Sequence, residues 1–406
     1  MRMAWIPLAA ALWATLLPAA ADEEPVPLDA PEKAEEPEKA EEPKPEAAQD
    51  PSVVQAVKHS TSEAAREPVR RGVDFLLRIQ NANGSWGSGE SARTYEILAN
   101  VPGSHHAFRV GTTALCVMAL ARSPFREADC KEAVRRGFDF LLDRALVRRP
   151  NGMELYNVWA FGYALHAFAT ILPTIEDPKL RERVLTLSNR LVKTLAIYQT
   201  PDGGWGYYDF DVGSYRPSDS SMSFTTATIL VSLHSIEKQG VDVPRAMLER
   251  AIKSVRKQRK EDGSYVYGPY LQYRPNHGVN QVKGSLGRTQ ACNLALWLYG
   301  EEVSEDDLRS GIENLFRHHH FLDIARKRPI PHEAWYYNSG YFFYYGHYYA
   351  GLVLDLLPAG DRVRWRAPHE KILLDRQETD GSWWDYPLYS YHKPYGTAYT
   401  LLTLIR

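Results

Sequence analysis

The amino-acid sequence predicts an all-α protein, an (α/α)6 toroid of six helical hairpins that follows a signal peptide and a disordered linker. Two observations support this fold class. A short motif recurs along the chain at a spacing near 60 residues, and charged amphipathic segments alternate with segments that carry almost no charge. With 406 residues, of which 44% are apolar, the chain can bury a large core.

Three regions are expected before the toroid. Residues 1–21 have a basic start, an apolar run and three alanines, which is the pattern of a secretory signal peptide. We therefore expect an exported protein, periplasmic or secreted, and an N-terminal membrane anchor is the less favoured alternative. Residues 22–50 repeat Pro, Glu, Ala and Lys with a net charge of −9, which indicates a disordered acidic linker. Residues 51–67 are expected to form an accessory helix outside the ring, and the toroid is assigned to residues 68–406.

The repeated motif reads Gln-x-x-x-Gly-x-Trp in its three intact copies, whereas a fourth copy has Arg and Tyr at its ends. Its glycines stand at steps of 119, 60 and 118 residues, so two of six units have lost the motif. We interpret the motif as structural, because Asn-Gly or Asp-Gly makes a turn, the Gln amide can satisfy free carbonyls at a helix end, and Trp can fill the gap between units. The motif residues are Gln80, Gly84, Trp86, Gln199, Gly203, Trp205, Gly263, Tyr265, Gln377, Gly381 and Trp383.

Each of the six units is expected to contain one amphipathic helix and one buried helix. The amphipathic segments have an apolar stripe and a charged opposite face; they span 68–80, 130–146, 178–199, 243–259, 304–320 and 369–377. A helix that is apolar all round is buried on all sides; such segments span 111–120, 157–172, 222–233, 288–300, 341–357 and 395–405. Because the polar helix is always on the same side of the hairpin, the buried helices are expected to form an inner ring inside an outer one.

Cysteine content and charge exclude several classes of protein. The three cysteines are an odd number, which excludes a full disulfide framework in an exported protein. Cys116 and Cys292 lie in apolar helical patterns and are expected in the core, and a bridge between Cys116 and Cys130 is not indicated. The net charge of +6 over residues 51–406 is too small to indicate a nucleic-acid partner. No metal-ligand spacing is present, and neither a metal nor a cofactor is predicted. We expect a monomer that takes a small apolar or glycan ligand and contacts an envelope or membrane-surface partner.

The motif at the end of an outer helix, followed by an inner helix rich in Thr and Ala, resembles the repeat of the prenyltransferase and squalene-cyclase superfamily. The resemblance covers about residues 68–406 and implies the α-α toroid of terpenoid cyclases and protein prenyltransferases. It does not extend to their catalytic residues. Where triterpene cyclases carry Asp-x-Asp-Asp-Thr-Ala, residues 222–227 read Met-Ser-Phe-Thr-Thr-Ala, without an acid. The segments that match the zinc site of prenyltransferases, 342–344 and 395–397, contain no ligand.

The loops after the motifs and the first turns of the inner helices are expected to surround the mouth of a central cavity. These loops are rich in tyrosine, which offers an apolar face and one hydroxyl. Such a lining suits a sugar, an isoprenoid or an extended peptide; the alternative is that the rings only pack long loops against each other. The candidate ligand-binding residues are Arg109, Trp159, Arg288, Trp335, Asn338, Tyr341, Tyr344, Tyr348, His392 and Tyr395.

Three residues are candidates for catalysis. Asp219 is a mouth carboxylate near the start of an inner helix, and the favoured alternative is that it caps that helix. Tyr345 and His347 lie in a row of tyrosines on the helix predicted over 341–357, where packing is the alternative role.

Three functions are compatible with this sequence, and the sequence alone does not decide whether the protein is an enzyme. The favoured hypothesis is an exported repeat protein that lacks the known catalytic motifs and binds an isoprenoid, a lipid or a peptide in an aromatic central cavity. The first alternative is a lyase or hydrolase that acts on an anionic polysaccharide, with Tyr345, His347, Asn338 and Arg288 as its candidates. The second alternative is a divergent terpenoid cyclase that uses Asp219 as its acid.

Overall fold

The computed structural model describes residues 61–90, 102–148, 156–207 and 219–405. These residues all belong to one compact unit, Val57–Arg406. The predicted signal peptide, the acidic linker and the first part of the expected accessory helix lie outside the described residues. Within them, no β-strand is present beyond a single bridge between Arg259 and Tyr265.

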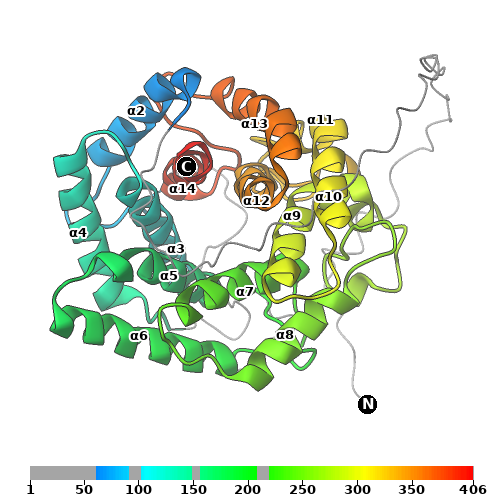
Figure 1. Cartoon of the computed structure of the whole chain (residues 1–406), viewed down its shortest axis with the longest axis horizontal. Helices are drawn as coiled ribbons and strands as arrows, with labels where there is room; N and C mark the ends of the chain where they lie inside the picture. Colours follow the sequence, from blue (N-terminus) through cyan, green and yellow to red (C-terminus); the bar gives the residue numbers. More distant parts are fainter. Residues whose placement is uncertain (1–60, 91–101, 149–155, 208–218, 406) are drawn as a thin grey trace, which may run out of the picture. The chain divides into compact units, whose positions relative to one another are not determined.

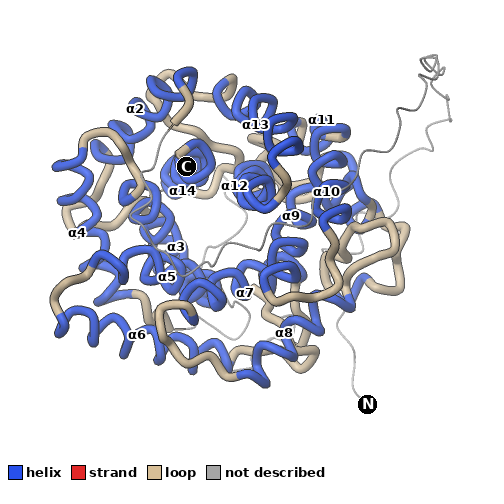
Figure 2. The backbone as a smooth tube through the Cα atoms, viewed as in Figure 1, coloured by secondary structure: helices blue, strands red, loops and turns tan. Residues whose placement is uncertain are grey.

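The described helices form two concentric rings, as Figures 1 and 2 show. Each inner helix packs against the next one, and the last inner helix packs against the first, so the ring is closed. The outer helices are α2 (Glu63–Arg78), α4 (Glu127–Arg144), α6 (Pro178–Ile197), α8 (Arg245–Lys257), α10 (Glu305–Arg317) and α13 (Ala359–Leu374). The inner helices are α3 (Pro102–Ala121), α5 (Asn157–Ile171), α7 (Ser223–Glu237), α9 (Val282–Leu298), α12 (Phe342–Leu356) and α14 (His392–Leu404). The predicted all-α toroid of six hairpins is confirmed.

Short segments complete the described part of the ring. The five-residue helix α11 (His319–Asp323) follows α10. The remaining elements are single 3-10 turns, η1 (Leu172–Thr174), η2 (Pro269–Leu271), η3 (Gly278–Asn280), η4 (Trp335–Tyr337) and η5 (Tyr389–Tyr391).

The inner helices are buried almost along their whole length because they are packed by two inner neighbours and by the outer ring. Small residues permit the closest approach between them. A Cβ atom at Gly346 of α12 would lie 2.6 Å from the Cα atom of Gly287 on α9, so glycine is required there. All three cysteines are buried thiols, in agreement with the expected core role of Cys116 and Cys292.

The motif connects each unit to the next one in the same way in all three intact copies. Gln199 donates from Nε2 to the carbonyl oxygen of Gly203 at 2.6 Å and to that of Met247 on the next outer helix at 2.8 Å. Trp205 donates from its indole nitrogen to the Leu195 carbonyl at 2.8 Å. The copies at Gln80 and Gln377 repeat both sets of bonds.

The last motif copy closes the ring. Gln377 donates to the carbonyl oxygen of Pro68 at 2.8 Å, and Pro68 lies in α2, the first outer helix. Arg71 of α2 donates in return to the carbonyls of Glu378 and Thr379. The structural interpretation of the motif therefore explains how the two ends of the described chain meet.

Several predicted boundaries were wrong. The segment 63–67 forms the first turn of α2 rather than a separate accessory helix, because Ser62 is the N-cap and accepts a hydrogen bond from the Ala65 nitrogen. Helix α13 begins at Ala359, ten residues before the predicted start, and Pro368 lies inside it. The predicted helix over 304–320 is interrupted at His318, after which α11 begins.

Candidate functional site

The inner-helix starts and the loops beside them carry a nearly continuous series of aromatic rings, which we call the aromatic belt. Neighbouring ring centroids along it lie between 4.9 and 6.0 Å apart, except that Tyr267 and Tyr341 meet through their hydroxyls at 3.3 Å. The belt links α3, α5, α7 and α12 through their loops to η5, and so passes through residues from all six units. Its members are Tyr391, Phe108, Tyr156, Tyr207, Phe224, Tyr267, Tyr341 and Tyr386.

Phe224 is the centre of this arrangement and was not predicted. Its ring lies 4.9 to 6.0 Å from five other aromatic rings, those of Trp159, Tyr207, Tyr267, Phe342 and Tyr345. The sequence contained an indication of it, because Phe224 occupies an acid position of the cyclase-like segment 222–227.

Four of these aromatic side chains stay partly exposed, namely those of Phe108, Trp159, Tyr207 and Tyr341. Behind them the tyrosines are buried, and Tyr345 donates its hydroxyl to the Phe224 carbonyl at 3.2 Å. A ligand that reaches the belt therefore meets aromatic faces first. Exposed clusters of this kind are typical of binding surfaces.

Arg288 lies beneath the belt and is fully buried, with 1% of its surface exposed. Its guanidinium carbon lies 5.1 Å from the ring centroid of Tyr267. It donates to three backbone carbonyls, those of Gly284, Tyr265 and Val279. Burial lowers the pKa of Arg288 below its ordinary value. The predicted ligand-binding arginine therefore holds loop backbone in place and stacks on the belt from the inside.

His332 is a polar neighbour of the belt. Its Nε2 lies 3.0 Å from the Tyr341 hydroxyl, and its Nδ1 lies 2.7 Å from the Tyr337 carbonyl. Its own backbone nitrogen donates to Ser339 at 2.7 Å. Burial lowers the pKa of His332 to about 4, so the ring is neutral at pH 7.

A buried carboxyl, also not predicted, lies at the start of α12. Asp385 accepts a hydrogen bond from the Tyr344 backbone nitrogen at 3.0 Å and one from the Tyr395 hydroxyl at 2.6 Å. Burial raises the pKa of Asp385 to about 7, and the bond from Tyr395 opposes that shift. Asp385 thus ties the final loop to the N-terminus of an inner helix.

The structure brings several predicted residues to the belt. Tyr341 belongs to it, Trp159 and Tyr345 contact Phe224, and Arg109 lies beside the Tyr391 hydroxyl. Tyr348 lies deeper in the inner ring, 5.3 Å from the ring of Tyr399. Tyr395 contacts the belt through its bond to the Tyr386 carbonyl.

Other predicted residues lie away from the belt. Trp335 lies in the 3-10 turn η4 and is 68% exposed. Asn338 is buried and donates to two backbone carbonyls, so it fixes a loop. His392 contacts Trp384 and its own turn at the Tyr389 carbonyl. Tyr344 lies among Arg326, Arg376 and Asp385, on the side of α12 that faces the outer layer.

The catalytic assignments of His347 and Asp219 do not fit their positions. The Nε2 atom of His347 lies 3.0 Å from Nε2 of His319, and its ring stacks at 5.1 Å on that of His369, in the layer between α12 and the outer helices. Asp219 is exposed and lacks the apolar surroundings that an alkene-protonating acid requires. It is not the cap of α7 either: Met222 is the N-cap, and Asp202 accepts from the Ser221 nitrogen.

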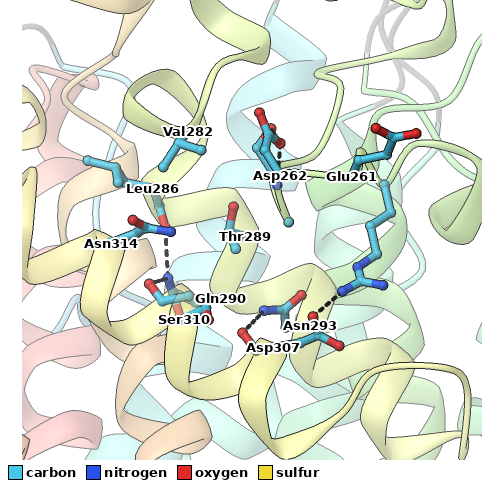
Figure 3. A pocket seen from close by; sticks show the side chains of 14 residues that line it. Glu261, Asp262, Val282, Leu286, Thr289, Gln290, Asn293, Asp307, Ser310 and Asn314 are labelled. Carbon is cyan, nitrogen blue, oxygen red and sulfur yellow. Dashed lines mark hydrogen bonds and ion pairs between the residues drawn. The ribbon is translucent and has the colours of Figure 1, made fainter.

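A polar cavity of about 180 Å³ lies beside the motif copy that has Arg and Tyr at its ends, residues 259–265 (Figure 3). Here Arg259 replaces the glutamine and pairs with Asp307 at 2.5 Å. Nothing lies within 4 Å of a Cβ atom placed on Gly263, so α10 is farther from this turn than its counterparts are elsewhere. Polar side chains of α9 and α10, among them Gln290 and Asn314, line the space that results.

Among the described residues, no group of three or more His, Cys, Asp or Glu side chains is arranged to hold a metal ion. None of the described helices combines the length and the apolar character that crossing a membrane requires.

Comparisons with known proteins agree with this fold. A model of the squalene–hopene cyclase C-terminal domain matches residues 45–229. The squalene–hopene cyclase of Zymomonas mobilis is 27% identical over 178 residues, which are 40% of this chain. The chain spans only 25% to 40% of the length of the curated squalene–hopene cyclases that it matches.

Solved structures give the same result for the fold. The type II terpene cyclase MstE from Scytonema superposes with a TM-score of 0.51 at 15% identity, over 84% of this chain and 97% of MstE. An MstE variant was solved with its substrate, geranylgeranyl dihydroxybenzoate. The α-1,6-mannanase of a Salegentibacter species gives a TM-score of 0.51 at 12% identity, over 83% of this chain and 97% of the mannanase. The structural likenesses show the ring alone, whereas the sequence matches confirm the predicted resemblance to the prenyltransferase and squalene-cyclase superfamily.

Proposed function

We propose that this protein binds an isoprenoid chain on its aromatic belt and does so without the acid of the known triterpene cyclases. The observation that carries the proposal is Trp159, a partly exposed indole on an inner helix that is otherwise almost wholly buried. Its ring lies 5.7 Å from Phe224 and 6.5 Å from Tyr345. Trp159 offers its partly exposed apolar face, and the buried rings of Phe224 and Tyr345 pack behind it. An aromatic surface of this kind suits a chain of methyl-branched alkene units.

The physical chemistry favours an apolar chain over a sugar polymer. Each Å² of apolar surface removed from water contributes about 25 cal/mol, and a prenyl chain consists almost entirely of such surface. A glycan would require many polar partners, whereas Arg288 and Asn338, two of the proposed glycan-site residues, already donate to backbone carbonyls. The superfamily likeness supports the same choice, because squalene and the geranylgeranyl group are both isoprenoid.

Binding is proposed rather than cyclisation of the known type. None of the residues at 222–227 can donate a proton to an alkene, and Phe224 there contributes to the belt. Asp219, the substitute acid of the cyclase alternative, is exposed. Asp385, the buried carboxyl that the described residues place at this end, is occupied by two donors from α12 and α14.

Export belongs to the same proposal. The pattern of residues 1–21 supports a secretory address, and residues 22–50 would then separate the ring from an envelope or membrane surface. Edman sequencing of the protein recovered from an envelope fraction tests this. A mature N-terminus at or near Asp22 is expected, and a chain recovered only with residue 1 intact from the cytosol would contradict it.

The binding proposal is tested by equilibrium dialysis of the purified full chain against geranylgeraniol. Saturable one-to-one binding is expected, and Trp159→Ala should weaken it at least tenfold, or about 1.4 kcal/mol, because a central aromatic contact is removed. Trp365→Ala is the matched control: Trp365 stacks at 4.7 Å on Phe316 in the outer layer, so binding should stay within twofold.

Two results would contradict the proposal. One is the absence of saturable binding by protein whose circular dichroism shows a folded helical ring. The other is an equal loss of affinity in both tryptophan variants, which would mean that binding follows general stability and not contact with the belt.

A further inference from the structure

Three belt tyrosines and one histidine form a hydrogen-bonded chain at the ring mouth. The Tyr207 and Tyr267 hydroxyls lie 2.5 Å apart, those of Tyr267 and Tyr341 lie 3.3 Å apart, and Tyr341 lies 3.0 Å from Nε2 of His332. The residues come from different loops and from the start of α12, so the fold has to assemble the chain.

One fixed proton sets the direction in which this chain donates, which is toward His332. The Tyr337 carbonyl can only accept, so Nδ1 of His332 carries the proton that is shared between them at 2.7 Å. The ring is neutral, and Nε2 therefore carries a lone pair and accepts from Tyr341. Because a phenol has a single proton, Tyr341 must accept from its phenol neighbours, and the protons of Tyr207 and Tyr267 are both donated within the chain.

Tyr207 stands at the open end of the chain. Its one proton is donated to a neighbouring phenol of the chain, and burial keeps its pKa well above the ordinary value, so the phenol stays protonated. Its side chain is partly exposed, and its ring stacks at 5.6 Å on Tyr156 within the belt. What Tyr207 presents to a ligand is therefore a lone pair on oxygen, and it cannot donate without reversing the whole chain.

We infer that the belt selects an isoprenoid that carries a hydrogen-bond donor at its head, an alcohol or a phenol, which donates to the Tyr207 oxygen. This inference rests on the proposed isoprenoid binding. Ethers and diphosphates offer that oxygen only acceptors, so the site discriminates against them. An acceptor that a bound ligand removes from water without giving it a donor is left unsatisfied, and sites of this kind reject the analogue strongly.

The test compares geranylgeraniol with geranylgeranyl methyl ether, whose prenyl chains are identical, by equilibrium dialysis on the full protein. The wild type is expected to bind the alcohol at least tenfold more tightly. In Tyr207→Phe, alcohol affinity should fall to within twofold of ether affinity, whereas Tyr273→Phe should keep the wild-type ratio, because Tyr273 is 86% exposed outside the belt.

A second variant tests the direction of the chain and does not depend on Tyr207→Phe folding well. Tyr341→Phe removes the acceptor of Tyr267, whose proton can then turn to Tyr207 and free the Tyr207 proton for the ligand. Binding of the methyl ether should therefore strengthen several-fold in Tyr341→Phe. Unchanged ether affinity in folded Tyr341→Phe would contradict the assigned direction.

The outcomes separate the two levels of the argument. Equal affinity of the wild type for alcohol and ether, or an unchanged ratio in Tyr207→Phe, overturns this inference and leaves isoprenoid binding standing. Failure of both ligands to bind the wild type overturns the proposed function and the inference together.

Discussion

Substitution of the motif glycines can separate the free-energy cost of left-handed backbone strain from the cost of overpacking, two effects that usually occur together. Gly203 and Gly263 both have positive φ angles, +97° and +75°, and both stand in the same turn of the motif. They differ in their surroundings. A Cβ atom on Gly203 would lie 2.5 Å from the Arg250 carbonyl oxygen on α8, whereas a Cβ atom on Gly263 would have nothing within 4 Å.

The expected costs follow from that difference. Gly263→Ala should cost only the left-handed backbone strain, about 1–2 kcal/mol. Gly203→Ala carries the same strain plus an overpacking cost of about 1–3 kcal/mol. Displacing α8 to relieve the contact would also lengthen the bonds from Gln199 to Met247 and from Arg250 to the Thr200 carbonyl.

The assay is thermal unfolding of both variants followed by far-ultraviolet circular dichroism at a fixed scan rate. For a domain of this size, about 2 °C is lost per kcal/mol, so the midpoint should fall about 2–4 °C in Gly263→Ala and about 4–10 °C in Gly203→Ala. Gly381→Ala repeats the crowded case against the Arg71 carbonyl at 2.6 Å and should resemble Gly203→Ala. Equal shifts at Gly203 and Gly263 would refute the conclusion that α10 lies farther from the turn at Gly263 than α8 lies from the turn at Gly203.

Two further predictions concern pH. Burial lowers the pKa of His319 to about 4. As the pH falls below 6.5, the unfolded chain therefore binds a proton that the folded chain does not bind until about pH 4, and stability decreases. The urea midpoint should fall with pH across that window, and His319→Leu should reduce the slope. Asp385 acts in the opposite direction, because its raised folded pKa of about 7 makes stability fall as pH rises from 3.8 through 7. Tyr395→Phe removes the bond that holds that pKa down, so it should destabilise the protein more at pH 8 than at pH 5, and an equal loss at both values in urea unfolding would contradict this assignment.

The ring could be predicted from the sequence because its cause is local and repeated. A glutamine, a glycine and a tryptophan at fixed spacing predict a turn, a helix-end bond and a packed indole, and the bonds of Gln199 and Trp205 bear this out. The start of α13 was missed for a local reason as well. Its first ten residues show no apolar stripe, and the helix continues through Pro368.

The site was predicted less well because its contacts join residues that are far apart in the chain. Tyr391 reaches Phe108 across the ring closure, and His332 meets Tyr341 through an irregular loop at a positive φ of 61°. Trp335 and Tyr341 lie in the same aromatic stretch of sequence, yet one is exposed and the other belongs to the belt. Aromatic composition alone cannot separate these two cases.

Residues 222–227 connect the resemblance to triterpene cyclases with the proposed isoprenoid binding. Two of its polar side chains are engaged in the fold, since Thr226 accepts from the Trp205 nitrogen at 2.9 Å and Ser223 donates to the Tyr267 carbonyl at 3.4 Å. The position that holds an acid in the triterpene-cyclase pattern holds Phe224, which touches five rings. A carboxyl there would be buried among aromatic faces and would stay protonated, which is what alkene protonation requires. Phenylalanine removes that proton and enlarges the apolar surface, so the position that holds an acid in the pattern becomes part of the surface that we propose for binding.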